Sequence, residues 1–224
     1  MTRVHVVVEG PTEESFVNNV LAPVFWPCEV YLTPIILGVP GHQGGNPNYA
    51  RVKRDVVVQL KQDPTAYCST MLDFYGLGRG FPGTPLPPNL SPLDKVCHLE
   101  RAMMEDIIAS VPGVLRPDLR FLPYLQLHEY EGLLFSDPEA FARGIYQPNL
   151  AASFRTVRAG FPTPEDIDDG PETAPSKRVL RLHPPYRKPL YGTLAALEVG
   201  IDTMRRECPH FRQWTERLEA LAAT

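Results

Sequence analysis

The chain has 224 residues, of which 43% are hydrophobic, and this is enough for one large α/β domain or for a domain with a sizeable insertion. No apolar run approaches the roughly 20 residues needed to span a bilayer, and no basic N-terminal region precedes an apolar stretch and a cleavage site. We therefore expect neither a membrane protein nor a secreted one. The formal net charge of −4 argues against a simple basic coat for nucleic acid.

The charge is distributed unevenly along the chain. Residues 1–176 contain 13 Lys or Arg and 21 Asp or Glu, a balance of −8, whereas residues 177–224 contain 9 and 5, a balance of +4. An acidic body with a basic tail can hold cations in one place and meet phosphates in another, although an ordinary solvated helical surface explains the same pattern.

The four cysteines are spaced singly, without a CxxC pair. This pattern is typical of reduced thiols in a cytoplasm, and it gives little support to a structural zinc site. The cysteines are Cys28, Cys68, Cys97 and Cys208.

In the N-terminal half, β-branched runs alternate with stretches of helical periodicity, which predicts right-handed crossovers and a mainly parallel sheet. The uninterrupted valines of the first strand indicate a central position, next to the strand that ends at Asp73. Thr12 is the expected N-cap of the first helix, and Pro34 favours an edge position for the second strand. The expected elements are a strand over 3–10, a helix over 11–25, a strand over 29–37, a helix over 48–63 and a strand over 67–76.

The next stretch, residues 76–92, is rich in Gly and Pro and predicts a long, partly rigid loop beside Asp73. Such a loop is either a lid over a site or a plain surface connection. After it we expect a helix over 91–111, a strand from 119 that runs into 128–131, a short helix over 137–145, a loop over 163–178, and helices over 189–208 and 210–223.

The expected fold class is α/β, with a Toprim-like (Rossmann-like), mainly parallel sheet flanked by helices. Residues 1–145 would form this core, with 76–92 as a loop insertion. Residues 146–224 would add a loop and a C-terminal helical extension that packs on the core.

Three predicted strand ends carry acidic residues: Glu9, Asp73, and Glu129 with Glu131. Ligands of open parallel sheets bind beyond the carboxyl ends of the strands, and carboxylates that converge there bind hard cations such as Mg²⁺. Each acid also has a local explanation, since Glu9 could bind the amide groups of the next turn and Asp73 could form an Asx-turn. One acid alone favours the local explanation, whereas acids at three strand ends together favour a metal site.

The segments around the first two acids resemble the Toprim fold, whose first motif is a strand followed by Glu-Gly. The stretch "VVVEGPTEESF" matches that motif, and "MLDFYG" stands where the fold places its second acidic motif. Toprim domains occur in topoisomerases, primases and nucleases, where the acids bind Mg²⁺ for phosphodiester chemistry. The resemblance therefore implies Mg²⁺ or Mn²⁺ as the cofactor and nucleic acid as the partner.

Over nearly its whole length the chain is similar to a bacterial family of Toprim-like proteins, of the domain-of-unknown-function 4276 type. Members of that family are often encoded near ATPases of the ABC or overcoming-lysogenization-defect type. The similarity thus implies an ATPase partner and a role in phage defence. The motifs that carry it are "VEGPTEESF", "MLDFYGL", "LQLHEYEGLLFSD", "GPETAPSKR" and "ECPHF..W".

The chain departs from the Toprim pattern in the second motif, which is usually Asp-x-Asp, because Tyr75 stands two residues after Asp73. Tyrosine is a poor Mg²⁺ ligand, so Glu129 or Glu131 would have to replace the missing carboxylate. If the strand extends through both glutamates they share a face, and if a helix begins at Glu129 they diverge. His128 is either a ligand or base, or a hydrogen-bonded core residue.

Basic residues of the C-terminal part are candidates for neutralising the charge that develops on a scissile phosphate. They are Lys177, Arg178 and Lys188, and ordinary loop basicity is the alternative explanation for them. Gly10 has no Cβ, so we expect it to allow both an unusual turn after Glu9 and the close approach of a phosphate.

These observations favour a metal-dependent nuclease that cleaves nucleic-acid phosphodiester bonds in the cytoplasm. The acids at the strand ends would bind the metal, Lys177 or Lys188 would steady the phosphate, and a water activated by the metal would be the nucleophile. The alternative is a catalytically weak or inactive Toprim-like subunit of an ATPase, and phosphoryl transfer on a nucleotide is a third hypothesis. The chain has no GxxxxGK[ST] motif, so it is not itself a P-loop ATPase.

The C-terminal helices carry apolar residues at helical spacing. This stripe predicts either a homo-oligomer or docking on a larger ATPase, and packing of the stripe on the chain's own sheet is the alternative. The residues are Leu194, Leu197, Ile201, Met204, Phe211 and Trp214.

Overall fold

The computed structural model describes residues 1–39, 42–43, 47–78, 80–167, 170 and 172–223. Within these residues the strands form a five-stranded sheet in the order β2-β1-β5-β6, with β7 also paired to β5, and a small antiparallel pair, β3 and β4. All pairings in the large sheet are parallel. The strands are β1 (Thr2–Val8), β2 (Val30–Ile36), β3 (Gly38–Val39), β4 (His42–Gln43), β5 (Tyr67–Asp73), β6 (Phe121–Leu122) and β7 (Leu125–Gln126).

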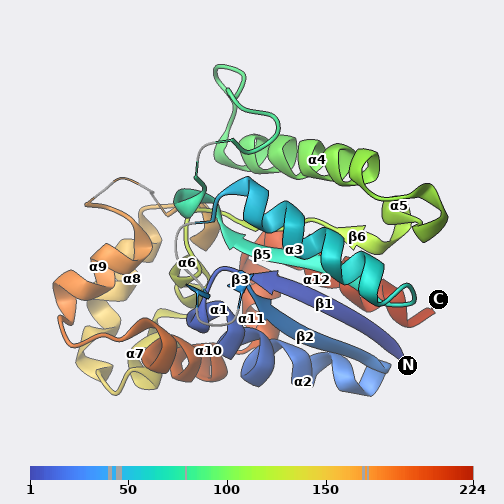
Figure 1. Ribbon diagram of the computed structural model, residues 1–224. Helices are drawn as coiled ribbons and strands as arrows, with labels where there is room; N and C mark the ends of the chain where they lie inside the picture. Colours follow the sequence, from blue (N-terminus) through green and yellow to red (C-terminus); the bar gives the residue numbers. More distant parts are fainter. Residues whose placement is uncertain (40–41, 44–46, 79, 168–169, 171, 224) are drawn as a thin grey trace.

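Strand β1 is central, as predicted, and its side chains enter two hydrophobic cores. Val4, Val6 and Val8 lie in the larger core, whereas Val7 points into the smaller one, because successive side chains of a strand alternate between its faces. Figure 1 shows α3 and α4 over one face of the sheet, with α2 and α12 over the other. The fold is therefore a Rossmann-like α/β sandwich. These helices are α2 (Ala22–Phe25), α3 (Tyr49–Gln62), α4 (Pro92–Ser110) and α12 (Pro209–Glu219).

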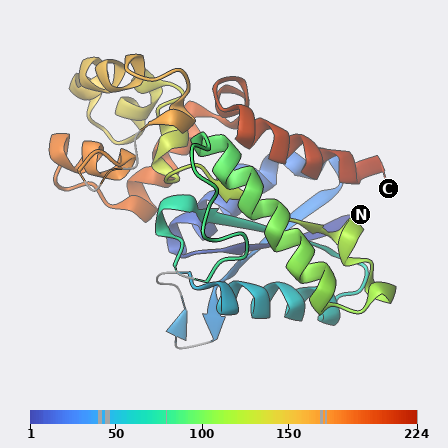
Figure 2. The same ribbon diagram turned by 90° about the horizontal axis from the view of Figure 1, so that it is seen from above.

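The shorter helices gather mainly at the end of the sheet toward which the strand arrows point (Figures 1 and 2). Helix α7 packs there against both α8 and α10. The α-helices are α1 (Pro11–Phe16), α5 (Pro117–Arg120), α6 (Glu131–Leu134), α7 (Pro138–Gly144), α8 (Ala151–Ala159), α9 (Pro175–Leu182), α10 (Thr193–Val199) and α11 (Ile201–Glu207). The π-helical and 3-10 segments are η1 (Val17–Leu21), η2 (Trp26–Cys28), η3 (Phe74–Gly76), η4 (Gly113–Leu115), η5 (Pro148–Leu150), η6 (Pro164–Asp166), η7 (Lys188–Gly192) and η8 (Ala220–Ala223).

The start of the first helix differs from the prediction. Thr12 is not its N-cap; the cap is Gly10, and Pro11 occupies the first helical position, where its fixed φ suits the helix. The Glu13 side chain accepts the backbone N–H of Gly10, so the capping role passes to a carboxylate one turn later. Pro34 does lie on an edge strand, because β2 is the outermost strand of the sheet.

The predicted long strand from 119 to 131 is wrong. Only β6 and β7 form, and they flank Pro123, which has no N–H to donate to a sheet. His128 then takes a left-handed conformation with φ of 59°, and a helix begins at Glu131. Neither glutamate therefore lies on a strand.

The other predicted elements are largely present. The helix expected over 11–25 forms as α1, η1 and α2 in succession. The loop expected over 163–178 is wrong at its end, where α9 includes residues 175–178. The helix expected over 189–208 is interrupted at Gly200, which has φ of 77°. Position 79 of the 76–92 loop and positions 168, 169 and 171 lie outside the described residues.

Most of the apolar stripe on the C-terminal helices is covered by the chain itself. Ile201, Met204, Phe211 and Trp214 are buried in the larger core, whereas Leu197 is 54% exposed. Packing on the chain's own sheet thus explains most of the stripe, and docking on a partner stays a prediction. No helix among the described residues is both long enough and apolar enough to cross a membrane.

Candidate metal centre

The strands that end at Glu9 and Asp73 are neighbours, as predicted, with Val8 of β1 opposite Met71 of β5. Since the two strands are parallel, both carboxylates lie at the same edge of the sheet. Glu9 Oε2 would lie only 3.2 Å from a Cβ on Gly76, so the missing side chain at Gly76 leaves room for the carboxylate. These two acids form the first half of the candidate site.

Glu129 and Glu131 reach the same site from the turn that follows β7. Glu131 is fully buried, and its Oε2 accepts a hydrogen bond of 3.0 Å from Lys188 Nζ. Glu129 Oε1 lies 3.7 Å from the same Nζ, and both of its oxygens accept hydrogen bonds from Ser176, at 2.9 Å from the backbone N–H and 3.1 Å from the hydroxyl. The turn is held against β5 because Asp73 Oδ1 accepts the N–H of Tyr130 at 2.9 Å. Tertiary contacts therefore bring Glu129 and Glu131 to the site, although neither residue lies on a strand.

A fifth acid, Glu13, was missed by the sequence reasoning. This residue is only 7% exposed, and its Oε2 accepts the N–H of Gly10 at 3.0 Å. The signal was available, because Glu13 shares the helical spacing of the buried face of α1 and η1. We refer to Glu9, Glu13, Asp73, Glu129 and Glu131 as the acid cluster. The buried apolar residues on the Glu13 stripe are Phe16, Val17 and Val20.

The electrostatics of the acid cluster are unfavourable to its charged form. Burial raises the pKa of Asp73 well above its usual value, and repulsion by Glu13 adds to the effect. Burial likewise raises the pKa of Glu9 and Glu131, and it raises the pKa of Glu13 to about 7. Burial lowers the pKa of Lys188, but the attraction of Glu131 and other acids outweighs it, so the pKa of Lys188 is raised. Among the described residues, the single ammonium group of Lys188 does not balance this many carboxylates.

Two oxygens of the acid cluster suit a cation. Glu9 Oε2 and Glu131 Oε1 are buried and have no hydrogen-bond partner among the described residues. Carboxylate oxygens are the donors that Mg²⁺ and Mn²⁺ prefer. Among the described residues, however, a different group of three possible ligands has its donor atoms within 4.8 Å of one another. This group is Cys97, Glu100 and His210, and it lies outside the acid cluster. The wider spacing of the acids fits a cation that keeps several of its waters, as Mg²⁺ usually does.

The remaining predicted basic residues have other surroundings than Lys188 has. Lys177 is exposed on α9. Arg178 Nε donates to the carbonyl of Thr173 at 2.6 Å, and its guanidinium lies 5.3 Å from the ring centroid of Phe161. Neither residue forms an ion pair with the cluster in the described part of the chain, so of the three candidates only Lys188 is placed at the site.

Gly10 lacks the unusual backbone turn expected of it, whereas His128 matches the core-residue alternative of its prediction. Gly10 has φ of −163°, an extended conformation open to any residue, so the expected unusual turn is wrong, and its N–H already binds Glu13. His128 is buried in the turn before Glu129, and its carbonyl accepts the N–H of Tyr75 at 3.0 Å. Tyr75 thus helps to position the turn through its backbone.

The comparison with protein families extends over nearly the whole chain. The model described as Domain of unknown function (DUF4276) matches residues 8–219. The chain belongs to this family. The match confirms the predicted membership and includes every acid of the cluster and Lys188, while the Toprim relationship of this DUF4276 chain stays a prediction. Searches of curated proteins and of solved structures gave no match.

Proposed function

We propose that this DUF4276 protein is a divalent-cation-dependent hydrolase that cleaves phosphodiester bonds in nucleic acid. The observation that carries the proposal is the acid cluster itself, where carboxylates from adjacent parallel strands and a neighbouring turn surround one lysine. Two of its buried oxygens, Glu9 Oε2 and Glu131 Oε1, lack a partner in the described part of the chain. Leaving buried charged oxygens unpaired is costly, and a bound cation would remove that cost.

Each residue of the site has a distinct part in the proposal. Glu9 and Asp73, fixed by β1 and β5, hold Mg²⁺ or Mn²⁺ together with Glu131. Glu129 is held by Ser176 and orients Lys188 beside Glu131. Lys188 offsets negative charge on the phosphate, and the absent side chain at Gly76 leaves space next to Glu9. When bound, the metal would activate water and stabilise the developing charge on the phosphate.

The charge of the acid cluster makes the order of binding testable. Without a cation the carboxylates repel a phosphate backbone, so nucleic acid should bind at this site only after Mg²⁺ or Mn²⁺ has done so. We expect the affinity for a short DNA or RNA duplex to rise when either ion is added to metal-stripped protein. The same titration on the Glu9→Gln variant should show no such rise.

The direct test is cleavage of supercoiled plasmid and of labelled RNA in the presence of Mn²⁺ or Mg²⁺. Glu9→Gln and Asp73→Asn keep the shape of the side chains and remove a charge, so each should abolish cleavage and the rise in melting temperature that Mn²⁺ produces. The metal-free variants should melt no lower than the parent, because the removed charges are buried and repelled. Glu14→Gln, next to Glu13 on α1 but outside the acid cluster, is the matched control. If calorimetry shows that Glu9→Gln and Asp73→Asn both bind the metal with unchanged affinity, the proposal is refuted.

A catalytically weak subunit of an ATPase is the second candidate function. The observation that favours it is Tyr75, which stands where a second carboxylate is expected and is 45% exposed. Under this hypothesis the cluster binds a cation without turnover, and the protein acts in the cytoplasm as part of a phage-defence complex. Metal-dependent stabilisation with no cleavage of DNA or RNA, together with an ATPase that copurifies with the native protein, would favour this candidate over the nuclease.

A further inference from the structure

A second group of possible metal ligands lies outside the acid cluster and joins two helices that are distant in the sequence. Cys97 and Glu100 belong to α4, and His210 belongs to α12. One donor atom from each of the three lies within 4.8 Å of the other two. Cys97 and Glu100 are three positions apart, so they share a face of α4. Sequence spacing alone gave no sign of this group, since 110 residues separate Glu100 from His210.

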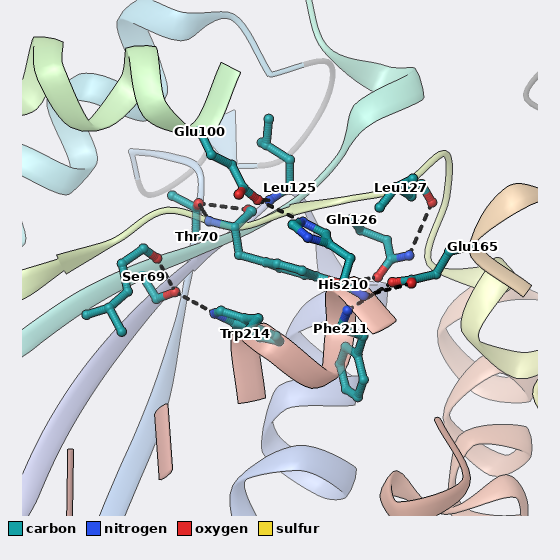
Figure 3. Close-up of polar contacts among 12 residues, drawn as sticks. Ser69, Thr70, Glu100, Leu125, Gln126, Leu127, Glu165, His210, Phe211 and Trp214 are labelled. Atoms are coloured by element: carbon teal, nitrogen blue, oxygen red, sulfur yellow. Dashed lines mark hydrogen bonds and ion pairs between the residues drawn. The ribbon is translucent and has the colours of Figure 1, made fainter. Parts of the chain in front are cut away.

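Two of the three side chains are held in place by contacts that do not involve Cys97. Figure 3 shows His210 between Glu100 and Glu165, with its backbone N–H donating to Glu165 at 2.9 Å. The imidazole stacks on Tyr124 with ring centroids 5.1 Å apart, and its Nε2 lies 3.0 Å from Glu100 Oε1. That oxygen also accepts the N–H of Leu125 at 2.8 Å. The carboxylate and the imidazole are therefore positioned before any ligand binds.

We propose that Cys97, Glu100 and His210 bind a transition metal of the Zn²⁺ class. A thiolate, an imidazole and a carboxylate form a donor set that suits Zn²⁺ or Co²⁺ and not Mg²⁺ or Ca²⁺. Three protein ligands leave a fourth position for water, as in zinc sites that are not closed by four side chains. A surface pocket of about 250 Å³, lined in part by Cys97, Glu100 and Arg217, gives the ion a route from solvent.

The ring of His210 limits the affinity of this site for a metal ion. Binding through Nε2 moves the ring proton to Nδ1, which is buried and has no hydrogen-bond partner in the described part of the chain. A buried N–H without an acceptor opposes binding, so the affinity should fall below that of a closed four-ligand zinc site. The bound ion would link α12 to α4 and thereby secure the C-terminal helices on the sheet. This role is separate from the acid cluster and does not depend on the proposed nuclease activity.

The test is a titration of metal-stripped full-length protein with Co²⁺ and then with Zn²⁺. We expect one equivalent of Co²⁺ to produce the absorption band of a thiolate bound to cobalt, Zn²⁺ to displace it, and excess Mg²⁺ to leave it unchanged. Because loss of an outer-shell partner weakens a metal site by about 10–100-fold, loss of a direct ligand in Cys97→Ser should weaken Zn²⁺ binding by at least about 100-fold. Cys28→Ser is the matched control, since Cys28 is a partly buried free cysteine outside the group.

The outcomes separate this site from both a chance contact and the acid cluster. Glu9→Gln should leave the cobalt band intact, and Glu100→Gln should weaken it, which gives a second variant should Cys97→Ser fold poorly. A missing band in the folded parent, or a band of equal intensity and affinity in Cys97→Ser, would overturn the proposal. The same conclusion follows if Zn²⁺ raises the melting temperature of Cys97→Ser as much as that of the parent.

Discussion

Replacing Glu13 by glutamine should make the metal-free protein more stable at high pH. Glu13 is almost fully buried, and burial with repulsion from Glu9 and Glu131 raises its pKa from 4.5 to about 7. Between these two values the folded protein retains a proton that the unfolded chain has released. The free energy of unfolding therefore falls as the pH rises through this range, and the loss is complete above pH 7.

The size of the effect follows from the shift in pKa. Each pKa unit corresponds to about 1.36 kcal/mol, so the change from 4.5 to about 7 costs about 3 kcal/mol once Glu13 is ionised. Glutamine carries no charge at any pH, and its side-chain oxygen can still accept the N–H of Gly10. Glu13→Gln should thus match the parent near pH 4.5 and exceed its free energy of unfolding by about 2–3 kcal/mol at pH 8.

Urea denaturation of the two proteins at pH 4.5, 6 and 8 in EDTA measures this difference. Glu14→Gln is the control, because Glu14 stands beside Glu13 on the same helix but is partly exposed and outside the acid cluster. Addition of Mn²⁺ at pH 8 should stabilise the parent more than Glu13→Gln, since the cation offsets the charge that the variant lacks. A parent and variant with the same pH dependence would refute the reasoning that the acid cluster carries uncompensated charge.

Two further predictions concern Lys188 and the helix pair at the carboxyl end of the sheet. Lys188→Met should destabilise the metal-free protein by about 1–2 kcal/mol, because buried Glu131 loses its ion pair. The cost stays in this range because the lysine side chain is 38% exposed and solvent screens the pair. Mn²⁺ should restore much of the lost stability. Equal melting temperatures of parent and variant in EDTA would contradict this expectation. Gly144→Ala should cost about 2–3 kcal/mol, because its Cβ would lie 2.5 Å from Ala195 Cα and force α7 away from α10. Gly113→Ala, whose Cβ would meet no atom within 4 Å, is the control in the same urea experiment.

The sheet and its two strand-end acids were predictable because they depend on local patterns. A run of valines identifies β1, and the alternation of strands and helices makes β1 and β5 parallel neighbours, which places Glu9 and Asp73 at one edge. The turn over 128–131 was not predictable in the same way. Pro123 and the left-handed His128 end the strand early, so the position of Glu131 depends on the tertiary contact with Lys188.

The sequence also could not show which of the predicted basic residues lies at the acid cluster. Lys177 and Lys188 stand in similar polar, Pro-containing stretches, and only packing distinguishes the exposed one from the one at the acid cluster. Glu13 was within reach of the sequence, because a charged residue on an otherwise apolar helical stripe indicates a buried carboxylate with a specific role. Its place in the first turn of α1 also suits helix capping, and capping does account for one of its oxygens.

The sequence predicted a core over 1–145 and an extension over 146–224, and residues of both ranges contribute to the candidate site. Ser176 supplies both hydrogen bonds to Glu129, and Lys188 supplies the cation nearest to Glu131, so the extension completes the acid cluster that the core begins. Elsewhere in the same segment, the ring of Trp214 stacks on Tyr124 with centroids 4.2 Å apart, and its indole N–H donates to Ser69 of β5. A buried cluster of carboxylates is destabilising unless cations and donors reach it. Residues 177–224 contain more basic than acidic residues, and the structure explains this excess at one position at least. Lys188 is the charge from this segment that reaches Glu129 and Glu131 in the described part of the chain.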